Sequence, residues 1–190
     1  SQMYKDSNRW CFSFQLWALY TRIKTIERAM DECIHLEQDI DVLLIERSSS
    51  ANRIFAHLMY DHNYLNECEW LMYNHFFDYF NSKCDFVLDG IIYLDCPVDL
   101  AMRRIEIRNR KGESSVTEQY QTALQHKHNE WLLAETENER IPILQVGVPY
   151  DCNEMAEKQA FQTIRQFMDA IEPANNVQQR PQNIAQVAKL

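Results

Sequence analysis

A carboxylate and a guanidinium stand side by side where a short apolar run of the sequence ends. The run covers 41–45, and Glu46, Arg47 and Ser48 follow it directly. Such a run is typical of a buried strand in a parallel sheet, and ligands bind outside the carboxyl ends of those strands. A carboxylate there can hold Mg²⁺, and the arginine beside it can neutralise a phosphate. The spacing alone leaves an ordinary ion pair at the strand end as the alternative.

Further along the chain, five cations fall within nine residues: Arg103, Arg104, Arg108, Arg110 and Lys111. Arg104 and Arg108 are four residues apart, so on a helix their like charges share a face and repel unless an anion lies between them. Arginine is also the best bidentate ligand for phosphate. The cluster therefore predicts phosphate binding, and a solvated basic face offset by Glu106 and Glu113 is the alternative.

The first predicted helix carries a set of aromatic and polar residues: Trp10, Phe14, Gln15, Trp17 and Arg22. An aromatic stripe at helical spacing usually packs in the core. Gln15 stands among apolar neighbours, and a buried amide needs hydrogen-bond partners. The edge of a nucleobase is one candidate partner, and the protein backbone is the other.

Alternating strands and helices must position these residues. Short apolar runs predict strands over 41–45, 90–94 and 141–146. Periodic apolar spacing predicts helices over 7–33, 53–60, 67–80, 100–108, 116–135 and 155–171, with a polar loop over 48–52. The alternation indicates an α/β domain whose parallel sheet is covered on both faces. We expect one domain over 1–171 and a frayed tail over 172–190, which is rich in Asn, Gln and Ala.

Composition excludes several classes of function. The 190 residues are 46% hydrophobic and 25% charged, as in one globular domain. A net charge of −9 disfavours general nucleic-acid binding and binding to anionic membranes. No apolar run approaches the ~20 residues of a membrane span. The six cysteines form no C-x-x-C pair, so we expect reduced thiols in the cytoplasm or an organelle.

Glycine is scarce, with only Gly90, Gly112 and Gly147 among the 190 residues. The sequence therefore contains neither G-x-G-x-x-G nor G-x-x-x-x-G-K-S/T, the usual cradles for nucleotide phosphates. A phosphate loop of this kind is excluded within these residues.

Several segments together resemble the deoxynucleoside kinase family, and most closely its deoxycytidine and deoxyguanosine kinase branch. They are MYK at 3–5, RWCFSFQ at 9–15, IERS at 45–48, NECEW at 66–70, LDGIIYL at 88–94, the arginine cluster and HNEWL at 128–132. The resemblance runs from Met3 to about Phe167 and implies a P-loop-kinase-like parallel sheet flanked by helices. The family's first strand, its phosphate loop and its glutamate general base precede the Met-Tyr segment and are missing from these residues.

The resemblance also implies roles for single residues. Glu46 would help to hold Mg²⁺, and Arg47 would lie beside the reacting 5′-hydroxyl. The residues implied to bind the nucleoside are Gln15, Arg22 and Phe55 at the base, Tyr4 and Glu113 at the deoxyribose 3′-hydroxyl, and Asn52 in the loop before Phe55. Those implied to clamp the donor phosphates are Arg104, Arg108 and Arg110.

Two local departures from the family pattern bear on these roles. The segment between Glu46 and Phe55 is one residue shorter, and the Asp that partners the base-recognition arginine is absent. Arg22 therefore lacks its usual countercharge, and would either tolerate different bases or point elsewhere. Lys111-Gly112 stands where the family often has acidic residues, which adds positive charge beside Arg108 and Arg110.

These expectations describe a deoxynucleoside kinase of nucleotide salvage and DNA precursor synthesis. It would transfer the γ-phosphate of ATP or another nucleoside triphosphate, provided that the whole protein carries the loop and the base; the 190 residues alone are expected to be inactive. The alternatives are a non-catalytic, kinase-like interaction subunit on the same fold and a nucleoside monophosphate kinase. We expect a cytoplasmic protein, with a mitochondrial one as the alternative. Helices 10–33 and 67–80 would form either a homodimer face or part of the core.

Overall fold

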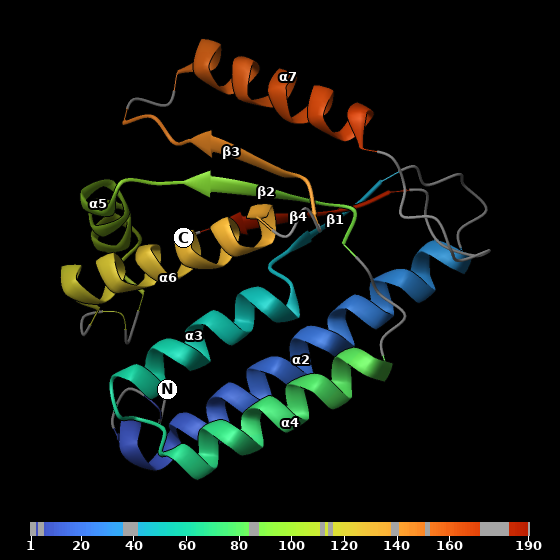
Figure 1. Ribbon diagram of the computed structural model, residues 1–190. Helices are drawn as coiled ribbons and strands as arrows, with labels where there is room; N and C mark the ends of the chain where they lie inside the picture. The colour runs from blue at the N-terminus through green and yellow to red at the C-terminus, as the bar shows by residue number, and fades with distance from the viewer. Residues whose placement is uncertain are drawn as a thin grey trace.

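The computed structural model describes residues 3, 6–35, 42–83, 88–110, 113, 116–137, 141–150, 153–171 and 183–189. Along the chain, its elements are α2 (Ser7–His35), β1 (Val42–Glu46), α3 (Ser49–Asp61), α4 (Glu67–Lys83), β2 (Gly90–Asp95), α5 (Val98–Arg108), α6 (Glu118–Glu137), β3 (Ile143–Gly147), α7 (Glu154–Ala170) and β4 (Asn183–Lys189) (Figure 1). The three predicted strands and six predicted helices are all present, with their ends shifted by a few residues.

The strands form a parallel sheet in the order β1-β4-β2-β3. The central strand β2 is buried on both faces, as its unbroken apolar sequence predicts. On one face, Ile91 and Tyr93 pack against Leu132 of α6. On the other face, Gly90 lies against Phe167 of α7 and Ile171 directly after it. The α/β architecture with a parallel sheet covered on both faces is therefore confirmed.

The strand β4 differs from the tail that we expected over 172–190. Residues 183–189 lie between β1 and β2 and pair with both, so that Leu44 and Gly90 both align with Ala185. This stretch contains the β-branched Ile184 and Val187 and no Gly or Pro, which suits a strand. The richness of 172–190 in Asn, Gln and Ala predicted a tail, and this average did not reveal the short strand within it. The rest of the expected tail lies outside the described residues.

The segment 48–52, which we expected to be a loop, begins a helix instead. Ser48 is the N-cap of α3, and its side-chain oxygen accepts a hydrogen bond from the backbone N–H of Ala51 at 3.2 Å. Three serines in a row suggested a turn, but a serine that caps a helix end satisfies an otherwise unpaired backbone donor. The helix therefore starts directly after the end of β1, which brings Asn52 and Phe55 close to Glu46.

Two apolar clusters hold α3 against the neighbouring helices. The first joins α2, α3 and α6 through Cys11, Ile54, Leu58, Met59, Leu65 and Leu124. The second joins α2, α3 and α4 through Leu19, Ile23, Ala56, Tyr73 and Phe77. A reciprocal capping pair between Asn66 and Glu69, with both hydrogen bonds at 2.9 Å, fixes the start of α4. These contacts make α3 a rigid support.

Among the described residues, no helix combines the length and the apolar character that crossing a membrane requires. Cys11, Cys33, Cys68 and Cys96 are free thiols.

Candidate functional site

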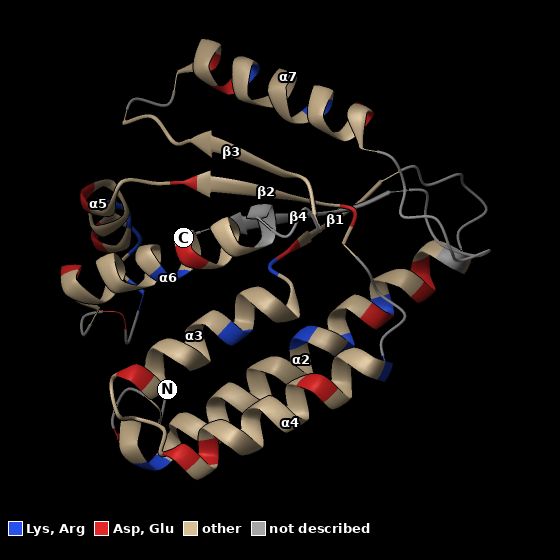
Figure 2. Cartoon of the chain, viewed as in Figure 1, with Lys and Arg blue, Asp and Glu red and all other residues tan. Residues whose placement is uncertain are grey.

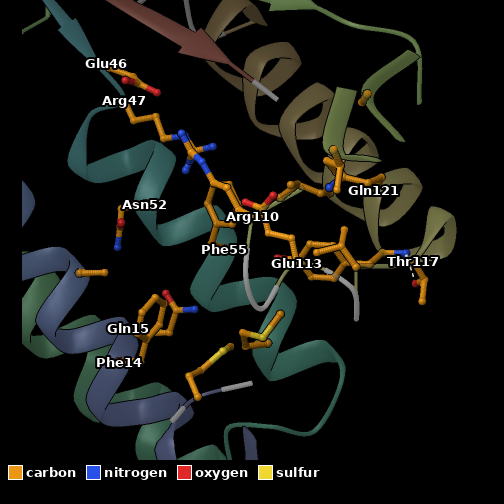
Figure 3. Close-up of a pocket in the computed structure, with 18 of the residues that line it drawn as sticks. Phe14, Gln15, Glu46, Arg47, Asn52, Phe55, Arg110, Glu113, Thr117 and Gln121 are labelled. Atoms are coloured by element: carbon orange, nitrogen blue, oxygen red, sulfur yellow. Dashed lines mark hydrogen bonds between the residues drawn. The ribbon is translucent and has the colours of Figure 1, made fainter. Parts of the chain in front are cut away.

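A cavity of about 1210 Å³ lies at the carboxyl ends of β1 and β2, between α2, α3, α5 and α6 (Figure 3). Residues from all four helices line it, together with Glu46 and Leu94 at the ends of the two strands. The predicted site residues that line it are Gln15, Arg22, Glu46, Arg47, Asn52, Phe55, Arg104, Arg108, Arg110 and Glu113. The remaining predicted residue, Tyr4, lies outside the described residues. Residues more than 90 positions apart in the sequence therefore line the same cavity.

The acidic and basic residues at the end of β1 project from a strained turn of the backbone. Glu46 ends β1 and Arg47 follows it, and Figure 2 shows a red and a blue segment next to each other between β1 and α3. Arg47 has φ 62°, which is the left-handed region that side-chain-bearing residues rarely adopt. Its guanidinium lies 4.5 Å from the ring centroid of Phe55, in a cation–π contact. Such strain persists only where surrounding contacts hold it, and it concentrates at functional sites.

The burial of Arg47 affects the pKa of its guanidinium. Burial lowers the pKa of the guanidinium and the nearby charge of Arg22 lowers it further, whereas Glu46 raises it. An arginine keeps its proton under these conditions because its pKa starts so high. The end of β1 therefore offers the cavity a permanent, partly desolvated positive charge.

Arg22 contacts the end of β1 rather than a carboxylate. Its Nη1 donates a hydrogen bond of 2.6 Å to the backbone carbonyl of Glu46. The Nε–H of Arg22 is buried and has no hydrogen-bond partner among the described residues. In the shortened segment, the side-chain amide of Asn52 donates to the hydroxyl of Tyr73 at 3.3 Å. Without the family's aspartate, the arginine thus points toward the backbone and keeps a buried donor unused.

Gln15 and Phe55 lie on opposite sides of the cavity. Gln15 is only 4% exposed although its side chain lines the cavity. Figure 3 shows Phe14 and Gln15 extending from α2, with Phe55 and Arg47 across from them. An aromatic face opposite a buried amide suits a flat, polar-edged ligand, because the ring can stack while the amide reads the edge.

One arginine of the cluster is paired with a carboxylate of the protein itself. Arg108 forms a bidentate pair with Glu113, with Nη2–Oε1 at 2.8 Å and Nε–Oε2 at 3.1 Å. Glu113 thus supplies a counter-charge to Arg108. The Nη1 of Arg104 lies 3.9 Å from the Sγ of Cys96. Lys111 and Gly112 lie outside the described residues.

Sequence reasoning missed the contribution of α6 to the cavity. Thr117, Tyr120, Gln121 and Leu124 line it, and Figure 3 shows Thr117 and Gln121 beside Glu113. Their spacing of three, four and seven residues is that of one helix face. This periodic signal was present in the sequence, but helical spacing alone does not distinguish a cavity wall from any other helix face.

A metal ion would have few protein ligands at this site. Among the described residues, no group of three or more His, Cys, Asp or Glu side chains lies close enough to hold one. Mg²⁺ usually keeps several waters and takes one or two carboxylates together with phosphate oxygens. The exposed carboxylate of Glu46 on the cavity wall fits that pattern.

Comparisons with known proteins agree with this geometry. A family model described as deoxynucleoside kinase matches residues 1–172. A probable deoxycytidine kinase of Fowlpox virus is 33% identical over 148 residues, covering 77% of this chain and 60% of that protein. Deoxycytidine kinase 1 of Xenopus laevis is 32% identical over 180 residues, covering 89% of this chain and 68% of that protein. The chain therefore spans about two thirds of the length of these relatives.

The fold is similar to that of a solved kinase. The structure of deoxyadenosine kinase from M. mycoides with bound dCTP superimposes with a TM-score of 0.67 at 22% identity, covering 90% of this chain and 79% of that one. This likeness confirms the predicted fold class.

Proposed function

This chain belongs to the deoxynucleoside kinase family, and from this premise we propose that its protein transfers the γ-phosphate of ATP, or of another nucleoside triphosphate, to the 5′-hydroxyl of a deoxyribonucleoside. The observation that carries the proposal is the single cavity lined by Gln15, Phe55, Arg47 and the α5 residues Arg104 and Arg108. Such an activity would serve nucleotide salvage and DNA precursor synthesis.

At the nucleoside, the proposed contacts would give hydrogen-bond partners to buried polar atoms of the chain. The amide of Gln15 is buried, and a base edge would accept from its N–H group and donate to its oxygen. The unpartnered Nε–H of Arg22 is a second donor that a base acceptor would satisfy. Phe55 would stack on the base, Glu113 would accept a hydrogen bond from the 3′-hydroxyl, and Tyr4 would bind the same hydroxyl. Asn52 would border the base as a further polar contact.

On the phosphate side, the proposed chemistry depends on positive charge. Phosphoryl transfer needs positioning and electrostatic stabilisation more than covalent catalysis. Arg47 would lie at the reacting 5′-hydroxyl, while Arg104, Arg108 and Arg110 would contact the donor phosphates. Glu46 would hold Mg²⁺, which supplies charge neutralisation at the phosphate oxygens. Arg108 would have to divide its donors between Glu113 and a phosphate.

Binding and transfer can be tested separately. Calorimetry would measure the affinity of the chain for deoxycytidine, deoxyguanosine, deoxyadenosine and thymidine, and a γ-³²P assay of the protein would measure transfer. We expect at least one deoxynucleoside to bind. Phe55→Ala should weaken this binding, while Lys158→Gln on the exposed side of α7 should leave the affinity unchanged. The absence of deoxynucleoside binding would contradict the proposal. Phosphorylation of a deoxynucleoside monophosphate alone would favour the monophosphate kinase alternative.

We further propose that the protein forms a homodimer through the outer face of α4. Leu71 is 56% exposed and Tyr79 is 57% exposed, so this face is not part of the core. Glu67, Leu71, His75, Tyr79 and Lys83 follow one another at four-residue spacing, which forms one ridge of the helix. In a second copy running antiparallel, this order would place Glu67 opposite Lys83 and Leu71 opposite Tyr79, twice over. The ridge is therefore complementary to itself.

We also propose a cytoplasmic location, with the mitochondrion as the alternative. The free thiols of Cys11, Cys33, Cys68 and Cys96 suit a reducing compartment. Fractionation of cells that carry the tagged natural protein would test this, and recovery in the mitochondrial fraction would favour the alternative.

A further inference from the structure

His128 of α6 is a buried titratable side chain to which the proposed chemistry gives no role. It is only 1% exposed, and its Nδ1 lies 2.8 Å from the backbone carbonyl oxygen of Leu124. A carbonyl oxygen can only accept, so Nδ1 carries a hydrogen and donates it. The ring is thereby held in one orientation by its own helix.

The imidazole lies between aromatic rings from two other elements. Tyr93 of β2 is stacked on it, with ring centroids 6.3 Å apart and an interplanar angle of 12°. Phe55 of α3 meets it edge to face, at 5.9 Å and 81°. The hydroxyl of Tyr93 donates to the side-chain oxygen of Asn129 at 3.3 Å, which fixes that ring as well. A column of rings thus runs from the sheet through α6 to α3.

The column ends at a charged group in the cavity. The guanidinium of Arg47 lies over the ring of Phe55, at 4.5 Å from the centroid. The backbone of Arg47 is in the left-handed region, with φ 62°, which is energetically unfavourable for a residue with a side chain. The contacts around the side chain must offset this cost, and the face of Phe55 is one of them. Any displacement of the Phe55 ring would therefore be passed on to Arg47.

We propose that His128 is a positioning residue whose ring fixes Phe55 and, through Phe55, the Arg47 guanidinium on the wall of the cavity. The inference rests on the proposed function in one respect, that Phe55 and Arg47 contact the nucleoside. In that setting His128 acts without touching the substrate.

The charge state of the ring is part of the arrangement. Burial lowers the pKa of His128, the hydrogen bond to Leu124 opposes that effect, and the charge of Arg47 lowers the pKa further. The groups that face the ring are Arg47 after β1, the Tyr93 hydroxyl on β2 and the uncharged Phe55 on α3. Burial raises the pKa of Tyr93, so this hydroxyl supplies no negative charge. Protonation below the ordinary pKa of 6.5 would therefore place a second cation close to Arg47, and none of the groups that face the ring supplies a negative charge.

Three variants of the 190-residue chain test the role of the ring. His128→Ala removes the ring, His128→Phe keeps a ring that cannot titrate, and His126→Ala changes an exposed histidine of the same helix as the control. Calorimetry would give the nucleoside Kd, circular dichroism would report folding, and NMR would follow the Phe55 ring and Arg47 side-chain signals between about pH 7.5 and 5.5, on both sides of an ordinary histidine pKa. We expect His128→Ala to weaken nucleoside binding about five- to tenfold and His128→Phe to stay within about twofold of wild type.

In the NMR titration, the Phe55 and Arg47 signals should move with acid in the wild type and stay still in His128→Phe. Wild-type affinity in a folded His128→Ala variant, or equal titration of these signals in His128→Phe, would overturn the inference. Should His128→Ala not fold, the comparison of wild type with His128→Phe still decides. If the wild type binds no nucleoside but its signals titrate as expected, the proposed function fails and the positioning by His128 stands.

Discussion

At the scale of single residues, Gln15 combines burial with a position on the cavity wall. Its amide is 4% exposed and stands among apolar neighbours, so it gains most from a ligand that pairs with both of its polar atoms. We predict that Gln15→Ala weakens deoxynucleoside binding by about 1–3 kcal/mol, because two hydrogen bonds to the base are lost. Calorimetry measures this change. An unchanged Kd in a folded variant would show that the amide pairs with the protein instead.

Arg104 lines the same cavity, on the side that we propose for the donor phosphates. Its Nη1 lies near the thiol of Cys96 at the end of β2, and its charge faces the space where donor phosphates would bind. We predict that Arg104→Ala slows phosphoryl transfer by about tenfold or more, while the nucleoside Kd changes little. Steady-state kinetics of the active protein, together with calorimetry, separates the two effects. The opposite result, a weakened Kd with an unchanged kcat, would assign Arg104 to the nucleoside.

The site residues could be predicted from the sequence more completely than their contacts. Residue type and spacing indicated Gln15, Arg22, Glu46, Arg47 and the arginine cluster, and the resemblance added Tyr4, Asn52 and Phe55 and gave Glu113 its role. The pairing of Arg108 with Glu113 and the hydrogen bond from Arg22 to the Glu46 carbonyl were not predicted. Both depend on how α2 and the end of α5 approach their neighbours, which local patterns do not encode.

At the scale of elements, Gly90 and Gly147 offer a matched test of packing. A Cβ on Gly90 would lie 2.5 Å from Cδ1 of Ile171 and 3.3 Å from the ring of Phe167, whereas one on Gly147 would meet nothing within 4 Å. We predict that Gly90→Ala lowers the free energy of unfolding by about 1 kcal/mol, because α7 must shift. Gly147→Ala should instead raise it by a few tenths, to about 1 kcal/mol, because the unfolded chain loses freedom. Urea denaturation gives both signs, and equal effects would refute the packing account.

Helices and strands were predictable where apolar periodicity dominated, and less so where a single residue type had two uses. The polar run at 48–52 looked like a turn because serine favours turns, but Ser48 caps α3. Residues 183–189 looked like part of a tail because Asn and Gln surround them, although Ile184 and Val187 suit a strand. Ser48 caps a helix rather than forming a turn because a helix begins beside it. Residues 183–189 form a strand because they pair with adjacent strands.

At the scale of the whole molecule, the buried His128 and the partly exposed His57 make stability depend on pH. Burial lowers the pKa of both His57 and His128 below 6.5, so the unfolded chain binds more protons than the folded one in this range. The stability that the neutral histidines contribute is therefore fully present above pH 6.5 and is lost progressively as the pH falls below it. We predict a falling urea midpoint between about pH 6.5 and 5, above the range where carboxylates titrate. The slope should shrink in His128→Phe and in His57→Gln, and an unchanged slope in both would contradict the assignment.

The proposed homodimer extends the same reasoning to two copies of the chain. If α4 packs antiparallel against its copy, Glu67→Lys places like charges opposite each other at both ends of the ridge. We predict a dissociation constant raised about three- to thirtyfold, from the loss of two exposed ion pairs. The double variant Glu67→Lys with Lys83→Glu recreates both pairs and should return the constant toward that of the wild type, which sedimentation equilibrium would measure. Partner proteins other than a second copy have no reason to accept the swapped charges. A wild type that stays monomeric at every concentration, or a double variant as weak as the single one, would show that this ridge does not bind itself.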